Sequence, residues 1–197
     1  MRDMLLPLIL FAAVGSLTPG PNNLMVTASG TAFGFGRTMP HLFGVTIGFG
    51  VMVLAFGFGL AEIFRAFPDF HWWLRILGAA YLLYLAVRIA RAGDPGAAET
   101  ARRPLTFIEA ALFQWVNPKA WTLALGVVTA FTTIGGNLSF ELAVIAGVFM
   151  LITFPSLAVW CLFGVAIRQF LASPRALRIT NLVMAALVAL SVVMLFV

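Results

Sequence analysis

Two short motifs place proline beside asparagine inside long apolar stretches. They are Thr18-Pro19-Gly20-Pro21-Asn22-Asn23 and Gln114-Trp115-Val116-Asn117-Pro118-Lys119. A proline has no N–H, so the carbonyl one turn earlier in the helix loses its hydrogen-bond partner. In lipid, such freed backbone groups are tolerated only where protein or a water-filled cavity supplies partners. Both motifs therefore predict membrane helices that are broken where polar groups can reach the backbone.

The two motifs occupy matching positions in the two halves of the chain. About half of the 197 residues separate Pro21 from Pro118, and each proline falls near the middle of the first helix of its half. A lone proline kink usually serves packing alone, whereas matched interruptions point to the central site of a transporter. Half-helix N-termini there attract anions and unwound carbonyls attract cations. This arrangement suits the carboxylate and the ammonium of an amino acid.

Polar side chains at the two breaks are the candidate ligands of such a solute. The amides of Asn22, Asn23, Gln114 and Asn117 can donate and accept hydrogen bonds, so they bind a ligand or tie helices together. Lys119 is the only lysine, about fifteen residues into its predicted helix. It could anchor a substrate carboxylate or carry a coupled proton; alternatively, it snorkels or pairs with a freed carbonyl.

The acidic residues offer fewer candidates for proton coupling. Burial favours the neutral form of a carboxyl group, and Glu109 lies one to two turns inside a predicted helix. Glu109 is therefore the second candidate for proton coupling beside Lys119. Glu62 and Glu141 fall near helix ends and are interpreted as interfacial.

The elements that position these residues are predicted to be transmembrane helices. The chain is 62% hydrophobic and 10% charged, whereas soluble domains are about 45–50% apolar and about 25% charged. A bilayer needs about 20 apolar residues per helix. Six segments meet this length, at about 4–29, 40–64, 71–90, 105–129, 140–170 and 175–197. The predicted fold is an all-α membrane protein with six transmembrane helices.

A polar stretch at 93–104 divides the chain into two halves of three helices. It contains Gly93, Pro95, Gly96 and several charges, a composition that breaks helices. With three helices each, repeat 1 (about 1–92) and repeat 2 (about 105–197) insert with opposite orientation. We expect residues 1–197 to form one domain of two inverted repeats, with the first helix of each repeat broken by proline.

The arginines predict the orientation of the chain in the membrane. Eight lie at connections on one side of the six predicted spans, namely Arg37, Arg88, Arg91, Arg102, Arg103, Arg168, Arg175 and Arg178. Only Arg2, Arg65 and Arg75 lie on the other side. Because Lys and Arg favour the cytoplasmic side, both termini are expected outside the cytoplasm. No basic face is interleaved with aromatics, so lipid headgroups rather than nucleic acid are the expected partner.

Several other functions are disfavoured by the residues present. Cys161 is the only cysteine and the two histidines, His41 and His71, are expected at helix ends. No predicted cluster supplies a catalytic nucleophile with its base or the ligands of a metal, so neither an enzyme nor a cofactor is expected. A scaffold would not need two matched polar breaks. A passive channel or uniporter could use the same polar midplane and stays an alternative.

One further pattern concerns helix packing. Gly44-Val45-Thr46-Ile47-Gly48 places two small residues one turn apart in the second predicted helix. This spacing lets another helix approach closely. The approach could occur within one protomer or across a homodimer.

Three stretches resemble the LysE/RhtB superfamily of amino-acid exporters. They are Ser16-Leu17-Thr18-Pro19-Gly20-Pro21-Asn22-Asn23 followed by Gly34 and Arg37, Asn117-Pro118-Lys119-Ala120-Trp121, and Gly78-Ala79-Ala80-Tyr81-Leu82-Leu83-Tyr84-Leu85-Ala86. The resemblance implies export from the bacterial cytoplasm across the inner membrane, driven by the proton motive force. It also implies that the two breaks face each other at mid-membrane. Carried over by position, Pro19, Gly20, Pro21, Asn22 and Asn23 match the first motif of the superfamily, and Asn117, Pro118 and Lys119 match the second. Together with Gln114, proposed above from its amide, they are the predicted substrate-binding residues.

The second helix departs from the pattern of this superfamily. Many relatives carry an aspartate a few residues after a glycine, whereas Ile47-Gly48-Phe49-Gly50-Val51 has no acid. Exporters of lysine or arginine are expected to keep such acids to balance a cationic side chain. The departure favours neutral solutes such as homoserine, threonine, leucine, cysteine or O-acetylserine over basic amino acids. The stretch from Phe107 to Thr133 and the sixth helix look closest to the cysteine/O-acetylserine branch.

Overall fold

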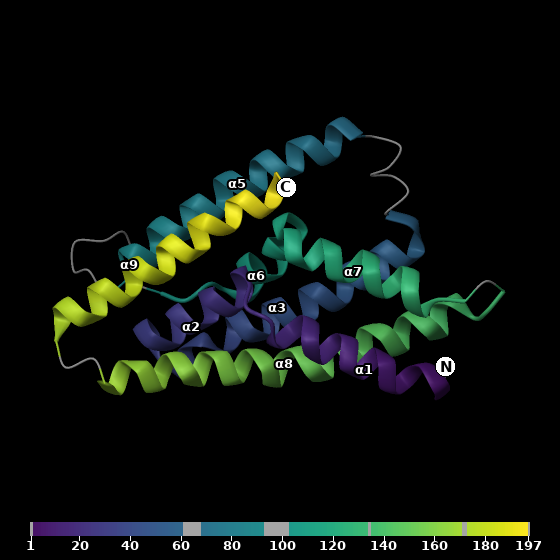
Figure 1. The fold of residues 1–197 in the computed structure, drawn as a ribbon, viewed down its shortest axis with the longest axis horizontal. Coiled ribbons are helices and arrows are strands. Elements are labelled where there is room, and N and C mark those ends of the chain that lie inside the picture. The colour runs from purple at the N-terminus through teal and green to yellow at the C-terminus, as the bar shows by residue number, and fades with distance from the viewer. Residues whose placement is uncertain (1, 61–67, 93–102, 134, 171–172, 197) are drawn as a thin grey trace.

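The computed structural model describes residues 2–60, 68–92, 103–133, 135–170 and 173–196. All regular structure in these ranges is helical, which confirms the all-α prediction (Figure 1). Four helices are long and apolar enough to cross a membrane, at Phe35–Leu60, Trp72–Ala90, Leu138–Gln169 and Arg175–Val193. If the bent pair of Met4–Leu17 and Pro21–Phe33 is counted as one more span, the described residues contain five. The predicted fourth segment consists of shorter helices.

Both predicted breaks interrupt the helices. The first separates α1 (Arg2–Leu17) from α2 (Pro21–Phe33), whose axes differ by 55°. The second lies between α6 (Phe107–Phe113), extended by the turn η3 (Gln114–Val116), and α7 (Pro118–Phe131). In each case the proline is the first residue of the second helix, where its missing N–H has no partner to lose.

The remaining helices are continuous. They are α3 (Phe35–Ala55), extended by the π-helical turn η1 (Phe56–Leu60), α5 (Pro68–Ala90), α8 (Leu138–Phe170) and α9 (Pro174–Leu190), extended by η4 (Ser191–Leu195). Gly34, with φ of 82°, is the single residue between α2 and α3. This left-handed conformation favours glycine and lets the chain reverse direction.

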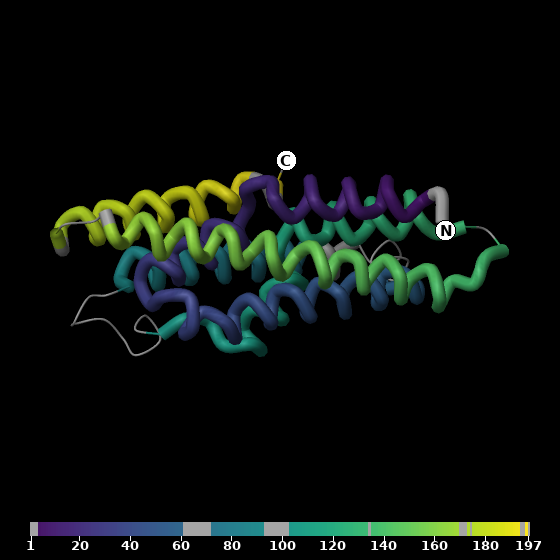
Figure 2. The backbone as a smooth tube through the Cα atoms, turned by 90° about the horizontal axis from the view of Figure 1, so that it is seen from below, coloured from purple at the N-terminus to yellow at the C-terminus, as the bar shows by residue number. Residues whose placement is uncertain are grey.

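Helix α8 is the central packing element. It contacts α1, α2 and α3 and runs between α1 and α3 in Figure 2. The hydroxyls of Thr27 and Thr31 donate to the carbonyls of Trp160 and Gly164 at 3.1 and 2.9 Å. The second bond lies four residues after the first on both helices, so α2 and α8 run in the same direction. One unbroken helix thus supports both halves of the broken one.

Helices α5 and α9 form an antiparallel pair beside this group (Figure 1). The Asn181 amide donates to the Ala92 carbonyl at 2.8 Å, and the rings of Trp72 and Phe196 lie 6.0 Å apart at the other end. Leu82 and Leu85 of α5 are buried in one cluster with Ala185 and Val188 of α9. The helix pair reaches α2 and the turn η3 next to the second break.

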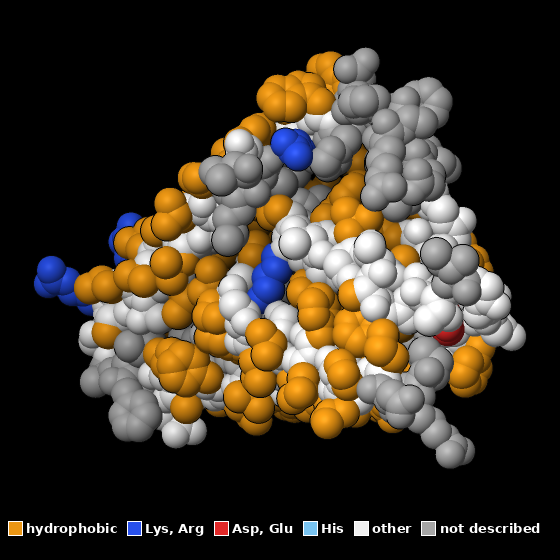
Figure 3. All heavy atoms as spheres, turned by 45° about the vertical axis from the view of Figure 1, so that its right-hand side comes forward, with side chains coloured by type: hydrophobic (Ala, Val, Ile, Leu, Met, Phe, Trp, Pro, Cys, Tyr) orange, Lys and Arg blue, Asp and Glu red, His pale blue; other side chains and the backbone are white. Residues whose placement is uncertain are grey.

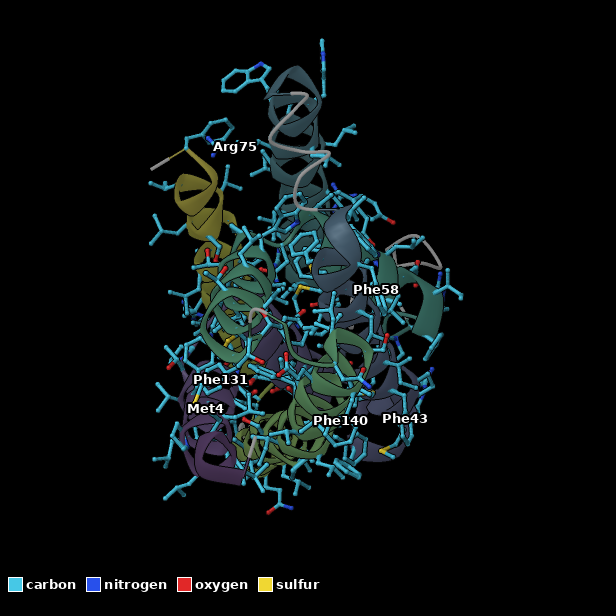
Figure 4. The ribbon with its side chains drawn as sticks, turned by 90° about the vertical axis from the view of Figure 1, so that its right-hand side faces the viewer. Met4, Phe43, Phe58, Arg75, Phe131 and Phe140 are labelled. Carbon is cyan, nitrogen blue, oxygen red and sulfur yellow. The ribbon has the colours of Figure 1, made fainter. Side chains whose placement is uncertain are left out.

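Two apolar clusters lie on either side of the breaks. One includes Met25 and Val26 of α2 with Leu82 of α5. The other includes Leu8 of α1 and Phe131 of α7, and Met4 packs against it near Phe131 (Figure 4). Polar groups at the breaks therefore lie between two apolar clusters.

The outer surface is apolar over much of its area. Figure 3 shows one face on which hydrophobic side chains predominate. Leu151 is 76% exposed, and Phe58 and Phe140 also lie on the outside (Figure 4). A soluble protein rarely exposes so continuous an apolar surface, so lipid is the solvent that these side chains require.

The small residues of α3 contact α6 within the same chain. A Cβ at Gly44 would clash with the carbonyl oxygen of Phe107, and one at Gly48 would lie 2.6 Å from the Cα of Ala111. The pattern therefore serves packing inside the protomer, and the alternative of a dimer contact is not needed to explain it.

Some predicted features lie outside the described residues. Glu62, Arg65 and Arg102 fall there, together with most of the predicted 93–104 loop. The side chains of Arg2 and His71 are likewise outside the description.

Candidate functional site at the two helix breaks

The structure brings the two breaks together although about 100 residues separate them. The amides of Asn22 and Gln114 pair reciprocally: Asn22 Nδ2 donates to Gln114 Oε1 at 2.8 Å, and Gln114 Nε2 donates to Asn22 Oδ1 at 3.3 Å. Lys119 Nζ donates to the Thr18 carbonyl. The end of α1 therefore meets the starts of α2 and α7 in one place.

The carbonyls that the first break frees are bonded by side chains from elsewhere. Asn23 Nδ2 donates to the Ser16 carbonyl at 2.9 Å, and the Trp160 indole of α8 donates to the Leu17 carbonyl at 3.3 Å. Lys119 donates to the Thr18 carbonyl, which is the next one along the chain. Three consecutive carbonyls at the end of α1 are therefore bonded by α2, α8 and α7, as a break in an apolar surrounding requires.

The second break is closed mainly by its own residues. The Asn117 side chain caps α7 by accepting from the Lys119 N–H at 3.2 Å. The Trp121 indole donates to the Trp115 carbonyl at 2.9 Å, and Gln114 Nε2 also donates to the Ala110 carbonyl at 2.8 Å. Local bonds of this kind fix the turn η3 against the start of α7.

Two helix N-termini meet at the breaks. Helix α2 starts after Gly20, which has no side-chain cap, and α7 starts after Asn117. Unbonded N–H groups and the helix dipole make such ends favourable for a negative group. The end of α1 presents carbonyls that favour a positive group, and the Lys119 ammonium occupies that position. Of the roles weighed for Lys119, the structure displays pairing with a freed carbonyl.

A cavity lies directly beside these groups. Its polar lining comes from Ser16, Asn22, Asn23, Asn117, Lys119 and Thr153, and apolar residues of α3, α7 and α8 complete it. Lys119 is the one charged residue among the described residues that line it. The centres of water molecules can occupy about 40 Å³ of it, which corresponds to roughly three waters.

Most of the predicted site residues gather at this cavity. Asn22, Asn23, Asn117 and Lys119 line it, and Gln114 is buried behind Asn22. Pro19, Gly20, Pro21 and Pro118 shape the two breaks. A Cβ at Gly20 would lie 2.6 Å from Lys119 Cδ, so the absence of a side chain there makes room for the lysine.

Glu109 lies apart from this cavity. Its carboxylate accepts from Arg103 at 2.6 and 2.9 Å and from Arg88 at 3.3 Å. It also forms a capping box with Thr106 at the start of α6. These bonds give Glu109 a structural task in joining α6 to α5.

The structure adds residues that the sequence reasoning did not select. Thr153 pairs with Ser16 at 3.0 Å and lines the cavity. A polar residue in the long apolar run of α8 was the available signal. His41 was expected at a helix end, which is wrong: it lies nearly two turns inside α3 and is 1% exposed.

Paired broken helices around a buried polar cavity, in a chain of long apolar helices, characterise secondary transporters. A sequence profile of the LysE type translocator family matches residues 13–197. The chain therefore belongs to the LysE type translocator family, which confirms the resemblance seen in the motifs.

The chain is also similar in sequence to individual efflux proteins. Cysteine/O-acetylserine efflux proteins are 37% identical in Salmonella typhimurium (127 residues), 33% in Klebsiella pneumoniae and 32% in Escherichia coli K12 (126 residues each). Each match covers 62% of this chain and 61% of the relative, so the chain matches less than two thirds of these proteins. No solved structure matches the chain.

Proposed function

We propose that this protein exports neutral amino acids or close derivatives across the bacterial inner membrane, with the solute held between the two helix breaks. The supporting observation is the meeting of two helix N-termini and three α1 carbonyls around Lys119. The substrate carboxylate would face the starts of α2 and α7, and the Lys119 ammonium, which has three N–H donors, would bond it while keeping Thr18.

The substrate ammonium would then be held by neutral oxygens. Ser16, Thr153 and the amide of Asn22 provide such oxygens in the cavity lining. A zwitterion satisfies both sets of groups at once, whereas a simple anion or cation satisfies only one. This pairing favours an amino acid over other small solutes.

The charge of the cavity favours a neutral side chain. Lys119 is the one charged group in its described lining, so the side chain of lysine or arginine would meet a like charge with no acid to balance it. The named relatives are efflux proteins for cysteine and O-acetylserine, both neutral amino acids. These two compounds are the first substrates that we would test.

Transport requires that the cavity widen. Its present room suits a few waters, so an amino acid enters only after the surrounding helices separate. We propose that residues 1–92 and 105–197 act as inverted three-helix repeats within six spans. Rocking of one repeat against the other would expose the breaks to each side in turn.

For proton coupling, Lys119 is the better candidate. It stands among lining groups that a solute would contact, and the loss of its proton would weaken its bond to the Thr18 carbonyl by removing the positive charge of the donor. Glu109 is held by two guanidinium groups and a backbone N–H, which stabilise its charged form and oppose protonation. We therefore place the exchangeable proton at Lys119.

The expected orientation follows the arginines. Arg168 donates to the Ala32 carbonyl at 3.4 Å, Arg37 lies over the Phe33 ring, and Arg88 and Arg103 join Glu109. These described arginines lie around one end of α2, which we propose faces the cytoplasm. Both termini would then lie on the periplasmic side.

The test is transport by purified protein in proteoliposomes. Vesicles would be loaded with labelled L-cysteine, O-acetyl-L-serine, homoserine, threonine, leucine, lysine or arginine, and a proton gradient would be imposed or collapsed by an ionophore. We expect gradient-stimulated efflux of neutral members and loss of it in Lys119→Ala. Movement only down the solute gradient would indicate a channel or uniporter, and efflux of lysine or arginine would contradict the neutral assignment.

A further inference from the structure

A groove separates α5 from α6 on the outside of the protein. Apolar and aromatic side chains line it, namely Leu77, Tyr81 and Tyr84 from α5 and Ile108, Leu112 and Phe113 from α6. The centres of water molecules can occupy about 490 Å³ of this α5–α6 groove, compared with about 40 Å³ of the cavity at the helix breaks. The proposed transport mechanism does not use this space.

The α5–α6 groove has a closed floor and an open side. Phe113 is buried at the floor, where its ring lies 5.9 Å from the ring of Tyr81. Leu77 and Leu112, one from each wall, are exposed and form the rims. A flexible chain could therefore enter the groove from the side and contact protein on three sides.

The groove lies at the depth of the hydrocarbon core of a membrane. Its α5 wall belongs to Trp72–Ala90, one of the helices that are long and apolar enough to cross a bilayer. Leu77 precedes Arg88 by eleven residues, which is about 16 Å along the helix. Half of a hydrocarbon core is about 15 Å thick. The groove thus extends from the charged end of α5 to about the middle of the bilayer.

The depth and the lining together select the occupant of the groove. Water is unfavourable against apolar walls, and the apolar group that a bilayer supplies at this depth is the acyl chain of a lipid. One leaflet is about as thick as the groove is long. Two walls and a floor give an acyl chain more van der Waals contacts than a flat helix surface does. The groove therefore favours one held chain.

The polar groups near the groove lie at one of its ends. Glu109 is the one charged residue in the described lining, and it bonds Arg88 and Arg103 beside the start of α6. Charged side chains are costly at the bilayer centre and favour the headgroup region. At the other end the lining is apolar and includes Leu77 and Val116. A phospholipid has its polar head and its acyl chains in the same order.

We infer that the α5–α6 groove holds one acyl chain of a phospholipid from the leaflet on the side of Arg88 and Arg103. The chain extends from Glu109 toward Val116, next to the second helix break. Helix α5 belongs to the first of the two proposed repeats and α6 to the second, so the chain lies between two parts that move in the proposed function. A role of this lipid in transport rests on the proposed function, whereas lipid binding does not.

Photo-crosslinking tests the binding site directly. The full chain would be kept in dodecyl maltoside micelles, in which detergent covers the outer surface, and titrated with a phosphatidylcholine that carries a diazirine in the middle of one acyl chain. Irradiation attaches that chain to the residues beside it, and peptide mass spectrometry locates the label. We expect labelling of α5 and α6 to saturate at one lipid per chain, whereas labelling of the outer face of α8 should rise in proportion to the probe.

Unlabelled competitors test whether the acyl chain is the part recognised. Phosphatidylethanolamine and phosphatidylglycerol should both displace the probe from α5 and α6. Glycerophosphocholine, which has the headgroup of the probe without its acyl chains, should not displace it. Displacement by glycerophosphocholine, or labelling of α5 and α6 that never saturates, would overturn the assignment.

Two variants fill the groove. Leu112→Trp adds volume at a rim and Val116→Phe adds it at the apolar end, so each should abolish the saturable labelling while the protein stays monodisperse. Leu151→Trp, on the outer face of α8 with 76% exposure, is the matched control and should keep it. Saturable labelling in both folded filling variants would overturn the inference. So would a dimer in light scattering that becomes a monomer in both, because the groove would then hold a second copy of the chain.

Efflux of L-cysteine from proteoliposomes separates this inference from the proposed function. A tryptophan cannot leave the groove as a lipid chain can when the repeats move, so Leu112→Trp should slow efflux several-fold relative to Leu151→Trp. Equal efflux of these two variants would overturn the role of the lipid in transport. If wild type shows saturable labelling but no efflux, the proposed function is wrong and the lipid site stands. If efflux is seen without saturable labelling, only the lipid site is wrong.

Discussion

The two helix breaks are made from similar residues but are stabilised in different ways. At the first, the Leu17 and Thr18 carbonyls are bonded by Trp160 and Lys119 from distant helices. At the second, Asn117 caps its own helix, and the Trp121 indole bonds a carbonyl six residues earlier. The first break thus depends on tertiary contacts, whereas the second is closed locally.

This difference suggests separate tasks for the two breaks. Contacts between helices can be exchanged for contacts with a solute when the helices move, so the first break can respond to ligand. Local bonds persist when a helix moves as a body, so the second break can act as a rigid platform that carries Lys119. Changes at the first break should therefore alter transport, and changes at the second should alter stability.

The largest effect is expected for Lys119→Ala, which removes the charged group that joins the second break to the Thr18 carbonyl at the first. A hydrogen bond to a charged group contributes about 1.5–3 kcal/mol, and about 1.4 kcal/mol corresponds to tenfold. We expect efflux of cysteine from proteoliposomes to fall by roughly 10- to 100-fold. Thr122→Ala, one turn later on the exposed side of α7, is the control. Wild-type efflux in Lys119→Ala would disprove the proposed junction.

The second largest effect is expected where α3 packs against α6, the helix that leads into the second break. Gly44→Ala would push a Cβ into the Phe107 carbonyl of α6, and overpacking of this kind destabilises by about 1–3 kcal/mol. We expect a lower unfolding temperature of purified protein in detergent, followed by loss of the monodisperse peak after heating. Gly147→Ala, which has open space at its Cβ, should leave that temperature unchanged.

If Gly44→Ala left stability intact but reduced efflux, α6 would move during transport. The second break would then not be a platform, and the comparison between the breaks would fail.

A smaller effect is expected from Gly20→Ala at the first break. Gly20 has φ of −171° and ψ of 179°, an extended conformation that alanine adopts readily. Its added Cβ would meet Lys119 Cδ at 2.6 Å and displace that flexible side chain. The displacement should weaken the bond from Lys119 to the Thr18 carbonyl without removing it. A loss of about 1 kcal/mol predicts about fivefold slower efflux. Initial rates over a concentration series would measure it, and unchanged rates would show that Lys119 tolerates other positions.

The sequence identified much of this arrangement because breaks in apolar helices are local events. A proline shows directly which carbonyl loses its partner, so Pro21 and Pro118 could be located as helix starts without a structure. Their pairing could be proposed because the two motifs hold matching positions in the two halves of the sequence. The polar side chains that meet at the breaks could also be named, since amides and a lysine in an apolar run need partners.

What the sequence missed depends on which helix faces which. The hydroxyl of Thr153 is distinguished from a packing threonine only by its neighbour Ser16, 137 residues away. His41 was placed at a helix end because Pro40 precedes it, yet α3 begins at Phe35 and continues through that proline. Glu109 was named as a candidate proton carrier from its place in a predicted helix, and the two arginines beside it are visible only in the structure. Such facts are tertiary, and no local pattern reports them.

The smallest predicted effect comes from making the same substitution, tryptophan to phenylalanine, at each break in turn. Trp160→Phe removes the donor to the Leu17 carbonyl at the first break, and Trp121→Phe removes the donor to the Trp115 carbonyl at the second. Each bond contributes about 0.5–1.5 kcal/mol. Trp160→Phe should change the efflux rate a few-fold with little change in unfolding temperature, whereas Trp121→Phe should lower that temperature and spare efflux per folded molecule. Equal effects from both variants would mean that the two breaks share one role, because each substitution removes one indole donor to a carbonyl and keeps an aromatic ring in place.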